Sequence, residues 1–135
     1  MKIVVDTNVI AYHLIGPDAF ASEVRELWVR VEEPVAPSLW EAELGNVLWM
    51  AVRAKVVAAV DASALLTLAG GLGIHSVSTR SLWQGALLRA VDSGVALYDT
   101  LFVELAEREG IALATFDRRV LKTWPEIARR PRDIS

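Results

Sequence analysis

Four acidic residues lie where their carboxylates could serve one shared site. Asp6 directly follows the β-branched run Ile3–Val5, and Asp117 closely follows the apolar run 111–115. Both runs are too short for helices and do not alternate, which is typical of parallel strands buried on both faces. A helical pattern follows each acid. Asp6 and Asp117 are therefore expected at the carboxyl edge of a parallel sheet, where open α/β folds bind ligands.

Glu43 and Asp99 are the other two acids of this set. Glu43 lies in the segment 38–55, which is apolar on almost every side, and a lone charge in such surroundings is very costly. Asn46, three residues later on the same helix face, supplies a hydrogen bond but no charge. Asp99 falls in the first turn of an expected helix, and Tyr98 is grouped with the apolar stripe of that helix.

Each of these acids also has a local explanation. Asp6 and Asp117 are suitable N-caps, and Asp99 is favoured by the helix dipole. The joint interpretation is stronger, because four converging carboxylates would repel one another and raise their pKa values unless a divalent cation were bound. Oxygen ligands and the absence of Cys favour Mg²⁺ or Mn²⁺ over zinc. Such an ion suits the hydrolysis of a phosphodiester, since it activates a bound water.

The elements that must position these acids alternate between strand and helix along the chain. This alternation predicts a three-layer α/β/α fold with a central parallel sheet of four to five strands, in a single domain spanning residues 1–135. Strands are expected over residues 3–5, 35–36, 74–77 and 111–115, with an edge strand after the basic segment 129–132. Helices are expected over approximately 7–15, 19–33, 38–55, 61–70, 79–93, 97–109 and 118–122.

Two further predictions concern the helix expected over 38–55. Ser38 and Glu41 have the spacing of a capping box, in which each side chain bonds to the other residue's backbone N–H. Trp40, Trp49 and Met50 leave this helix with little polar surface. That composition favours a hydrophobic contact between the subunits of a homodimer.

The composition limits the possible classes of protein. Hydrophobic residues make up 53% of the chain and charged residues 23%, which is typical of a packed globular protein. The net charge is −3, from 14 basic and 17 acidic residues, so any attraction for nucleic acid must be local or metal-mediated. The absence of Cys fits a cytoplasmic location. No secretory signal is visible, and glycines interrupt the uncharged stretch 62–79, so no membrane association is expected.

At four places the sequence resembles PIN-domain nucleases. The similar motifs follow the order and spacing of that family over nearly the whole chain: Val4–Asn8, Glu43–Leu48, Tyr98–Leu101 and Ala114–Arg119. The small single-domain form resembles the VapC toxin branch. This resemblance implies a metal-dependent endoribonuclease that is usually dimeric, that forms the toxin of a type II toxin–antitoxin pair, and that a small antitoxin protein holds inactive.

The resemblance also implies roles for individual residues. Thr115 matches a small hydroxyl residue near the fourth acid, and Asn46 accompanies Glu43, so both are expected to support the acids. Three alternatives remain open: an RNA-processing nuclease outside toxin pairs, a phosphodiesterase acting on DNA or small nucleotides, and a non-catalytic interaction module. The residues implied to be catalytic and to bind Mg²⁺ or Mn²⁺ are Asp6, Glu43, Asp99 and Asp117.

Overall fold

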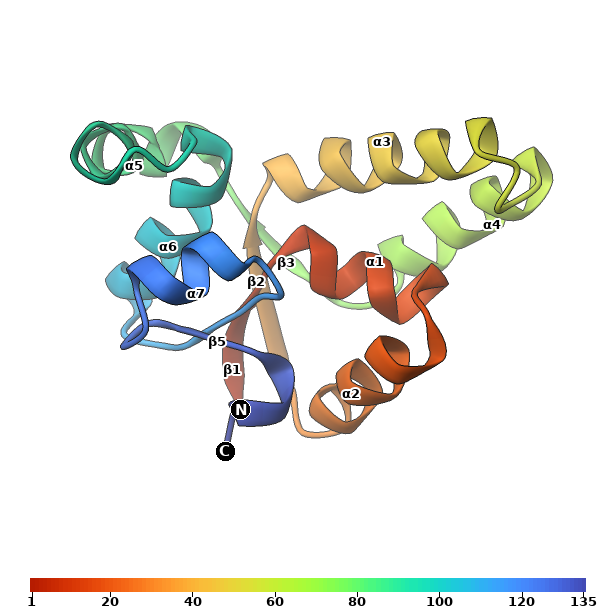
Figure 1. The fold of residues 1–135 in the computed structure, drawn as a ribbon, viewed down its shortest axis with the longest axis horizontal. Helices are drawn as coiled ribbons and strands as arrows, with labels where there is room; N and C mark the ends of the chain where they lie inside the picture. The colour runs from red at the N-terminus through yellow and green to blue at the C-terminus, as the bar shows by residue number, and fades with distance from the viewer.

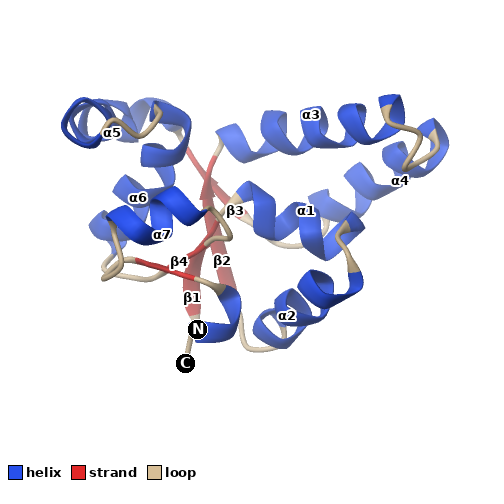
Figure 2. Ribbon diagram, in the orientation of Figure 1, coloured by secondary structure: helices blue, strands red, loops and turns tan.

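The computed structural model describes residues 1–135, and its centre is a parallel sheet of five strands in the order β3-β2-β1-β4-β5. Helices cover both faces, so the predicted three-layer α/β/α fold is confirmed (Figures 1 and 2). No helix is both long and apolar enough to cross a membrane. The strands are β1 (Lys2–Val5), β2 (Glu33–Pro37), β3 (His75–Val77), β4 (Leu113–Ala114) and β5 (Ala128–Arg129).

Two groups of helices lie on opposite faces of the sheet. From β1 the chain moves outward through β2 to β3, then returns past β1 to β4 and continues to β5. Because parallel crossovers are right-handed, this reversal of direction places α1–α4 on one face and α5–α7 on the other (Figure 2). The helices are α1 (Thr7–Ile15), α2 (Asp18–Trp28), α3 (Leu39–Arg53), α4 (Ala59–Gly70), α5 (Thr79–Ser93), α6 (Leu97–Glu109), α7 (Arg118–Thr123) and a final 3₁₀ turn (Pro131–Asp133).

The strand order reverses between β1 and β4, which makes their carboxyl ends the switch point of the sheet. Val5 pairs with Ala114 across this boundary, and both residues are fully buried. Burial from both faces explains why these short strands are continuously apolar. Ligands of open α/β sheets bind outside the carboxyl ends of the strands at such a point.

Three local predictions are wrong. Helix α2 ends at Trp28 rather than at Glu33, because Glu33 begins β2 and pairs with Lys2 of β1. The edge strand β5 includes Arg129 and so forms within the basic segment instead of after it. Trp40, expected at a subunit contact, is buried in the core.

The predicted capping box is also absent. Ser38 is already helical and its hydroxyl accepts a hydrogen bond from the backbone N–H of Thr79, at 3.3 Å, so it contacts the start of α5. Glu41 instead accepts a hydrogen bond from the Ser76 hydroxyl, at 3.0 Å. The competing partners are about 40 residues away in sequence, on β3 and α5, because β2 and β3 are neighbours in the sheet.

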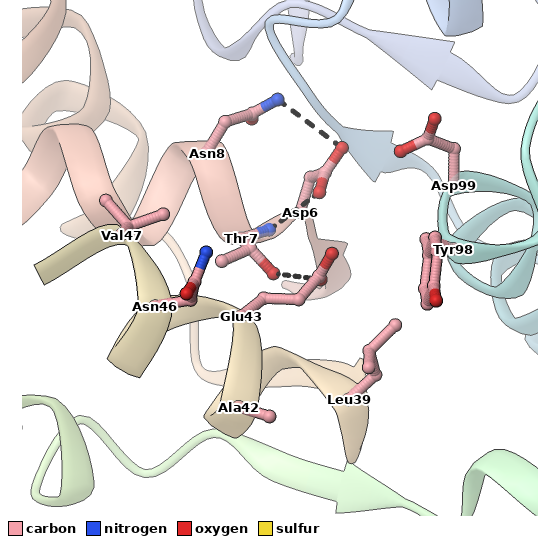
Figure 3. Close-up of a pocket in the computed structure, with 10 residues that line it drawn as sticks. All are labelled: Asp6, Thr7, Asn8, Leu39, Ala42, Glu43, Asn46, Val47, Tyr98 and Asp99. Atoms are coloured by element: carbon pink, nitrogen blue, oxygen red, sulfur yellow. Dashed lines mark hydrogen bonds between the residues drawn. The ribbon is translucent and has the colours of Figure 1, made fainter. Parts of the chain in front are cut away.

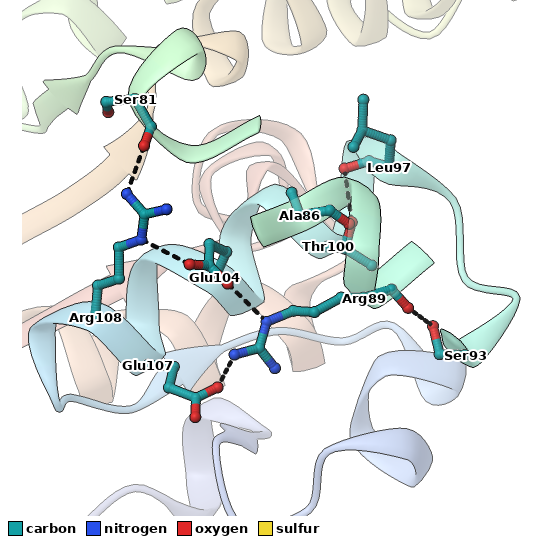
Figure 4. A network of polar contacts seen from close by, with 9 residues as sticks. All are labelled: Ser81, Ala86, Arg89, Ser93, Leu97, Thr100, Glu104, Glu107 and Arg108. Carbon is teal, nitrogen blue, oxygen red and sulfur yellow. Dashed lines mark hydrogen bonds and ion pairs between the residues drawn. The ribbon is translucent and has the colours of Figure 1, made fainter. Parts of the chain in front are cut away.

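A network of charged residues fixes α6 against α5 (Figure 4). The Glu104 carboxylate accepts hydrogen bonds from Arg89 at 2.9 Å and from Arg108 at 2.6 Å. Burial alone would raise the pKa of Glu104, but these two guanidinium groups outweigh it and hold the pKa below its usual value. Gly85 makes room for this carboxylate, since a Cβ there would lie 2.5 Å from the Glu104 Cδ. This clamp of Arg89, Glu104 and Arg108, called the Glu104 clamp below, thus holds the helix that carries Tyr98 and Asp99.

We expect Gly85→Ala to destabilise the protein by at least about 1 kcal/mol, because overpacking outweighs the better helix propensity of Ala. The matched control is Gly45→Ala in α3, where nothing lies within 4 Å of an added Cβ. That substitution should stabilise the protein by about 0.5–1 kcal/mol. Urea denaturation of both variants measures the difference, and equal effects would show that the Glu104 clamp yields freely.

Candidate active site

Asp6 lies at the switch point, where β1 ends and α1 begins. Its Oδ1 accepts a hydrogen bond from the Thr7 N–H at 2.7 Å, as an N-cap does. Its Oδ2 accepts a second hydrogen bond, at 2.8 Å, from the hydroxyl of Thr115, which directly follows the neighbouring strand β4. The side chain of Asn8 lies within 3.5 Å of the same oxygen. Asp6 is therefore held by the start of α1 and by the residue that follows β4, and only 7% of its surface is exposed.

Glu43 reaches this point from α3. Its Oε1 accepts a hydrogen bond from the Thr7 hydroxyl at 2.8 Å, so the first residue of α1 orients the Glu43 side chain (Figure 3). Asn46, one turn further along α3, lines a pocket together with Asp6 and Glu43. Its side-chain amide lies 3.7 Å from the Met50 sulfur. Thr7 thereby links Glu43 to the N-cap of α1.

Asp99 and Asp117 lie on the other side of the switch point. Asp99 is in the first turn of α6 and faces the pocket. Asp117 is the N-cap of α7, where its Oδ1 accepts hydrogen bonds from the backbone N–H groups of Arg119 at 2.9 Å and Val120 at 3.1 Å. Its own N–H donates to the Thr115 hydroxyl at 3.0 Å. Thr115 therefore connects the loop of Asp117 to Asp6.

Three of the four predicted acids line one pocket of about 480 Å³, within the usual size of ligand sites. Asp117 does not line this pocket, but it is close enough to Asp99 for its charge to act on that carboxylate. Thr115, the predicted supporting residue, is also outside the lining and contacts Asp6 through its hydroxyl. The lining residues are Asp6, Thr7, Asn8, Leu39, Ala42, Glu43, Asn46, Val47, Tyr98 and Asp99 (Figure 3).

The carboxylates of this pocket perturb one another. Burial raises the pKa of Asp6 to about 7; the Thr115 hydrogen bond opposes this shift, and the charges of Asp99 and Glu43 add to it. Burial also raises the pKa of Glu43, against the hydrogen bond from Thr7. The pKa of Asp99 is raised by burial and then by the charge of Asp117. Such shifts in a cleft are characteristic of functional sites.

The donor set fits a hard divalent cation. All three lining acids offer oxygen ligands, and a bound cation would offset both the burial and the mutual repulsion that raise their pKa values. No group of three or more His, Cys, Asp or Glu side chains is gathered closely enough to enclose an ion by itself. Mg²⁺ sites in proteins commonly use one or two carboxylates directly and keep several waters.

Sequence reasoning assigned no role to Thr7, Asn8 or Tyr98. Thr7 and Asn8 follow Asp6 directly in the sequence, and this proximity alone could have indicated that they lie at the same site. Asn8 also accepts a hydrogen bond from the Phe116 N–H at 3.2 Å, which only the pairing of β1 with β4 brings about. Tyr98, grouped with the apolar stripe of its helix, is instead 62% exposed at the pocket.

A comparison with protein families decides the identity of the fold, because the PIN domain model matches residues 3–124. This chain belongs to the PIN-domain family. Its relatives include Ribonuclease VapC3 of Pyrobaculum aerophilum, 29% identical over 94% of this chain and 98% of that protein. Ribonuclease VapC3 of Mycobacterium tuberculosis is 30% identical over 92% of this chain and 88% of that protein. These relatives place the chain with the VapC ribonucleases of the PIN-domain family.

The PIN-domain fold is also found among solved structures. VapBC2 from Rickettsia felis, bound to a DNA fragment from its promoter, has a chain that matches with a TM-score of 0.66. The match covers 96% of this chain and 98% of that one, at 17% sequence identity. At this identity the likeness concerns the fold alone, and it agrees with the five-stranded parallel sheet described above.

Proposed function

We propose that this chain is a metal-dependent endoribonuclease and the toxin of a type II toxin–antitoxin pair. The observation that carries the proposal is the convergence of Asp6, Glu43 and Asp99 on one pocket at the switch point of a PIN-domain sheet. Relatives named ribonucleases, similar over nearly the whole chain, support RNA as the substrate. The proposed catalytic acids are these three together with Asp117.

The residues of the pocket hold and orient the acids. Thr7 and Thr115 each donate a hydroxyl hydrogen bond to a carboxylate, and in this way fix the directions of Glu43 and Asp6. Asp6, Glu43 and Asp99 would hold Mg²⁺ or Mn²⁺, with Asp117 adding negative charge beside Asp99. When bound, the ion supplies a water of lowered pKa and stabilises charge on the phosphate oxygens.

The proposed partners are an antitoxin protein and a second copy of this chain, in the cytoplasm. The VapBC complex among the similar structures and the VapC relatives support the antitoxin. Exposed apolar side chains support a homodimer: Trp49 and Met50 on α3, and Trp83, Leu87 and Val91 on α5. Light scattering at micromolar concentration measures this assembly.

Metal binding gives the first test. Millimolar Mn²⁺ should raise the melting temperature of chelator-treated protein, because a ligand that binds only the folded state stabilises it; the gain is about 2.7 kcal/mol at a hundredfold excess over the Kd. The same ion should restore cleavage of single-stranded RNA after chelation. Asp6→Asn is the control, and its melting temperature should respond less. If Mn²⁺ produced neither a thermal shift nor cleavage, a non-catalytic module would be favoured.

A further inference from the structure

Tyr98 is an exposed aromatic residue on a rigid support. It immediately precedes Asp99 in the first turn of α6, and 62% of its surface is exposed. Its neighbours anchor the helix, since Leu101 is buried and the Thr100 hydroxyl donates to the Ala86 carbonyl of α5 at 2.7 Å. The Glu104 clamp holds the same helix one turn later. The backbone position of Tyr98 is therefore set by the fold, while most of its side chain is exposed to solvent.

Charged and apolar side chains share the lining of the pocket. In Figure 3 the Tyr98 side chain lies below Asp99 of the same helix and across the cavity from Glu43, with Leu39 below them. In Figure 3 the Tyr98 ring is seen edge-on, with its flat face turned to the cavity that Glu43 borders. The remaining apolar lining comes from Ala42 and Val47 of α3.

Leu39, Ala42 and Val47 offer a phosphate no hydrogen-bond donor and a cation no ligand, and Tyr98 offers only its hydroxyl and its ring face. A flat aromatic face beside a phosphate-processing site instead matches a nucleobase, which stacks on Tyr in a sequence-tolerant way. The base must be unpaired, because a base within a duplex is already stacked on both sides and its faces are inaccessible.

We infer that Tyr98 is a stacking platform for an unpaired base next to the scissile phosphate. The inference rests on the proposed nuclease function and adds to it the residue that positions this base. A stacked base typically contributes between about 5-fold and 150-fold to affinity. Tyr98→Phe keeps the stacking face, so the phenol hydroxyl should matter little.

The test measures RNA affinity in the Asp6→Asn background, which prevents cleavage. The probes are a labelled single-stranded RNA of about 12 nucleotides and an abasic strand of the same length and charge. We expect Tyr98→Ala to weaken binding of the RNA by about 5-fold or more and to leave binding of the abasic strand unchanged. Tyr98→Phe should bind both strands like the parent. Thermal melting checks that each variant folds. We expect that they do, because Tyr98 is largely exposed.

Two results would overturn this inference while leaving the nuclease intact. Equal losses of affinity for the RNA and the abasic strand would mean that Tyr98 supports the backbone or the fold. Unchanged binding of both strands would mean that the ring contacts no base. Metal-dependent cleavage by the protein with Asp6 and Tyr98 intact is measured in parallel. If that protein cleaves no RNA, the proposed function and the inference both fail.

Discussion

Asp6→Asn should abolish metal-dependent RNA cleavage and also stabilise the metal-free protein above neutral pH. The pKa of Asp6 is raised from 3.8 to about 7 in the folded protein, first by burial. Between these values the folded state retains a proton that the unfolded state has lost, so stability falls as pH rises and the loss is complete above about pH 7. The shift sets an upper limit of about 4 kcal/mol on this destabilisation. Asn keeps the volume and cannot ionise.

Urea denaturation in chelator at about pH 5 and about pH 8 measures this effect. The parent should be less stable at the higher pH, and Asp6→Asn should remove most of that difference. Asp92→Asn is the matched control: Asp92 is exposed on α5, so its substitution should change stability by less than about 0.5 kcal/mol at both pH values. If Asp6→Asn were instead destabilised and still cleaved RNA, Asp6 would be only a helix cap.

Glu43→Gln should fold normally and lose cleavage on the order of 100-fold or more, because removing a carboxylate that we propose to bind the metal forfeits several kcal/mol of transition-state stabilisation. The Gln side-chain carbonyl can still accept the hydrogen bond from Thr7, so the local geometry is retained. Burial raises the pKa of Glu43, and removing this strained charge should not lower stability in metal-free buffer.

Glu41→Gln is the matched control for Glu43→Gln. Glu41 is two residues away on the same helix and does not line the pocket. Its contact with the Ser76 hydroxyl survives, since Gln offers the same acceptor oxygen. Cleavage should remain near that of the parent, with a change in stability below about 0.5 kcal/mol. Rates on one RNA and melting temperatures of both variants decide the assignment; an inactive Glu41→Gln would move the second acid to Glu41.

Local patterns were enough to predict the class of fold and the end of its first strand at Val5. Burial on both faces leaves a continuous apolar run, so Ile3–Val5 identified a central strand before Asp6 was placed. The helix that carries Glu43 and Asn46 was likewise predicted, because its length and composition are local properties. The hydrogen bond from Thr7 to Glu43 was not predicted, because it depends on residues that are close in space and distant in sequence.

The strand order and the long-range contacts were decided by the tertiary structure alone. No sequence pattern states that β4 lies beside β1, yet that pairing places Thr115 at 2.8 Å from Asp6. The capping box failed for the same reason, because the Ser38 hydroxyl found a partner in Thr79, which the sheet brings near. A helical stripe shows which side chains share a face but not which of them the rest of the molecule covers, and Tyr98 lies exposed at the pocket for that reason.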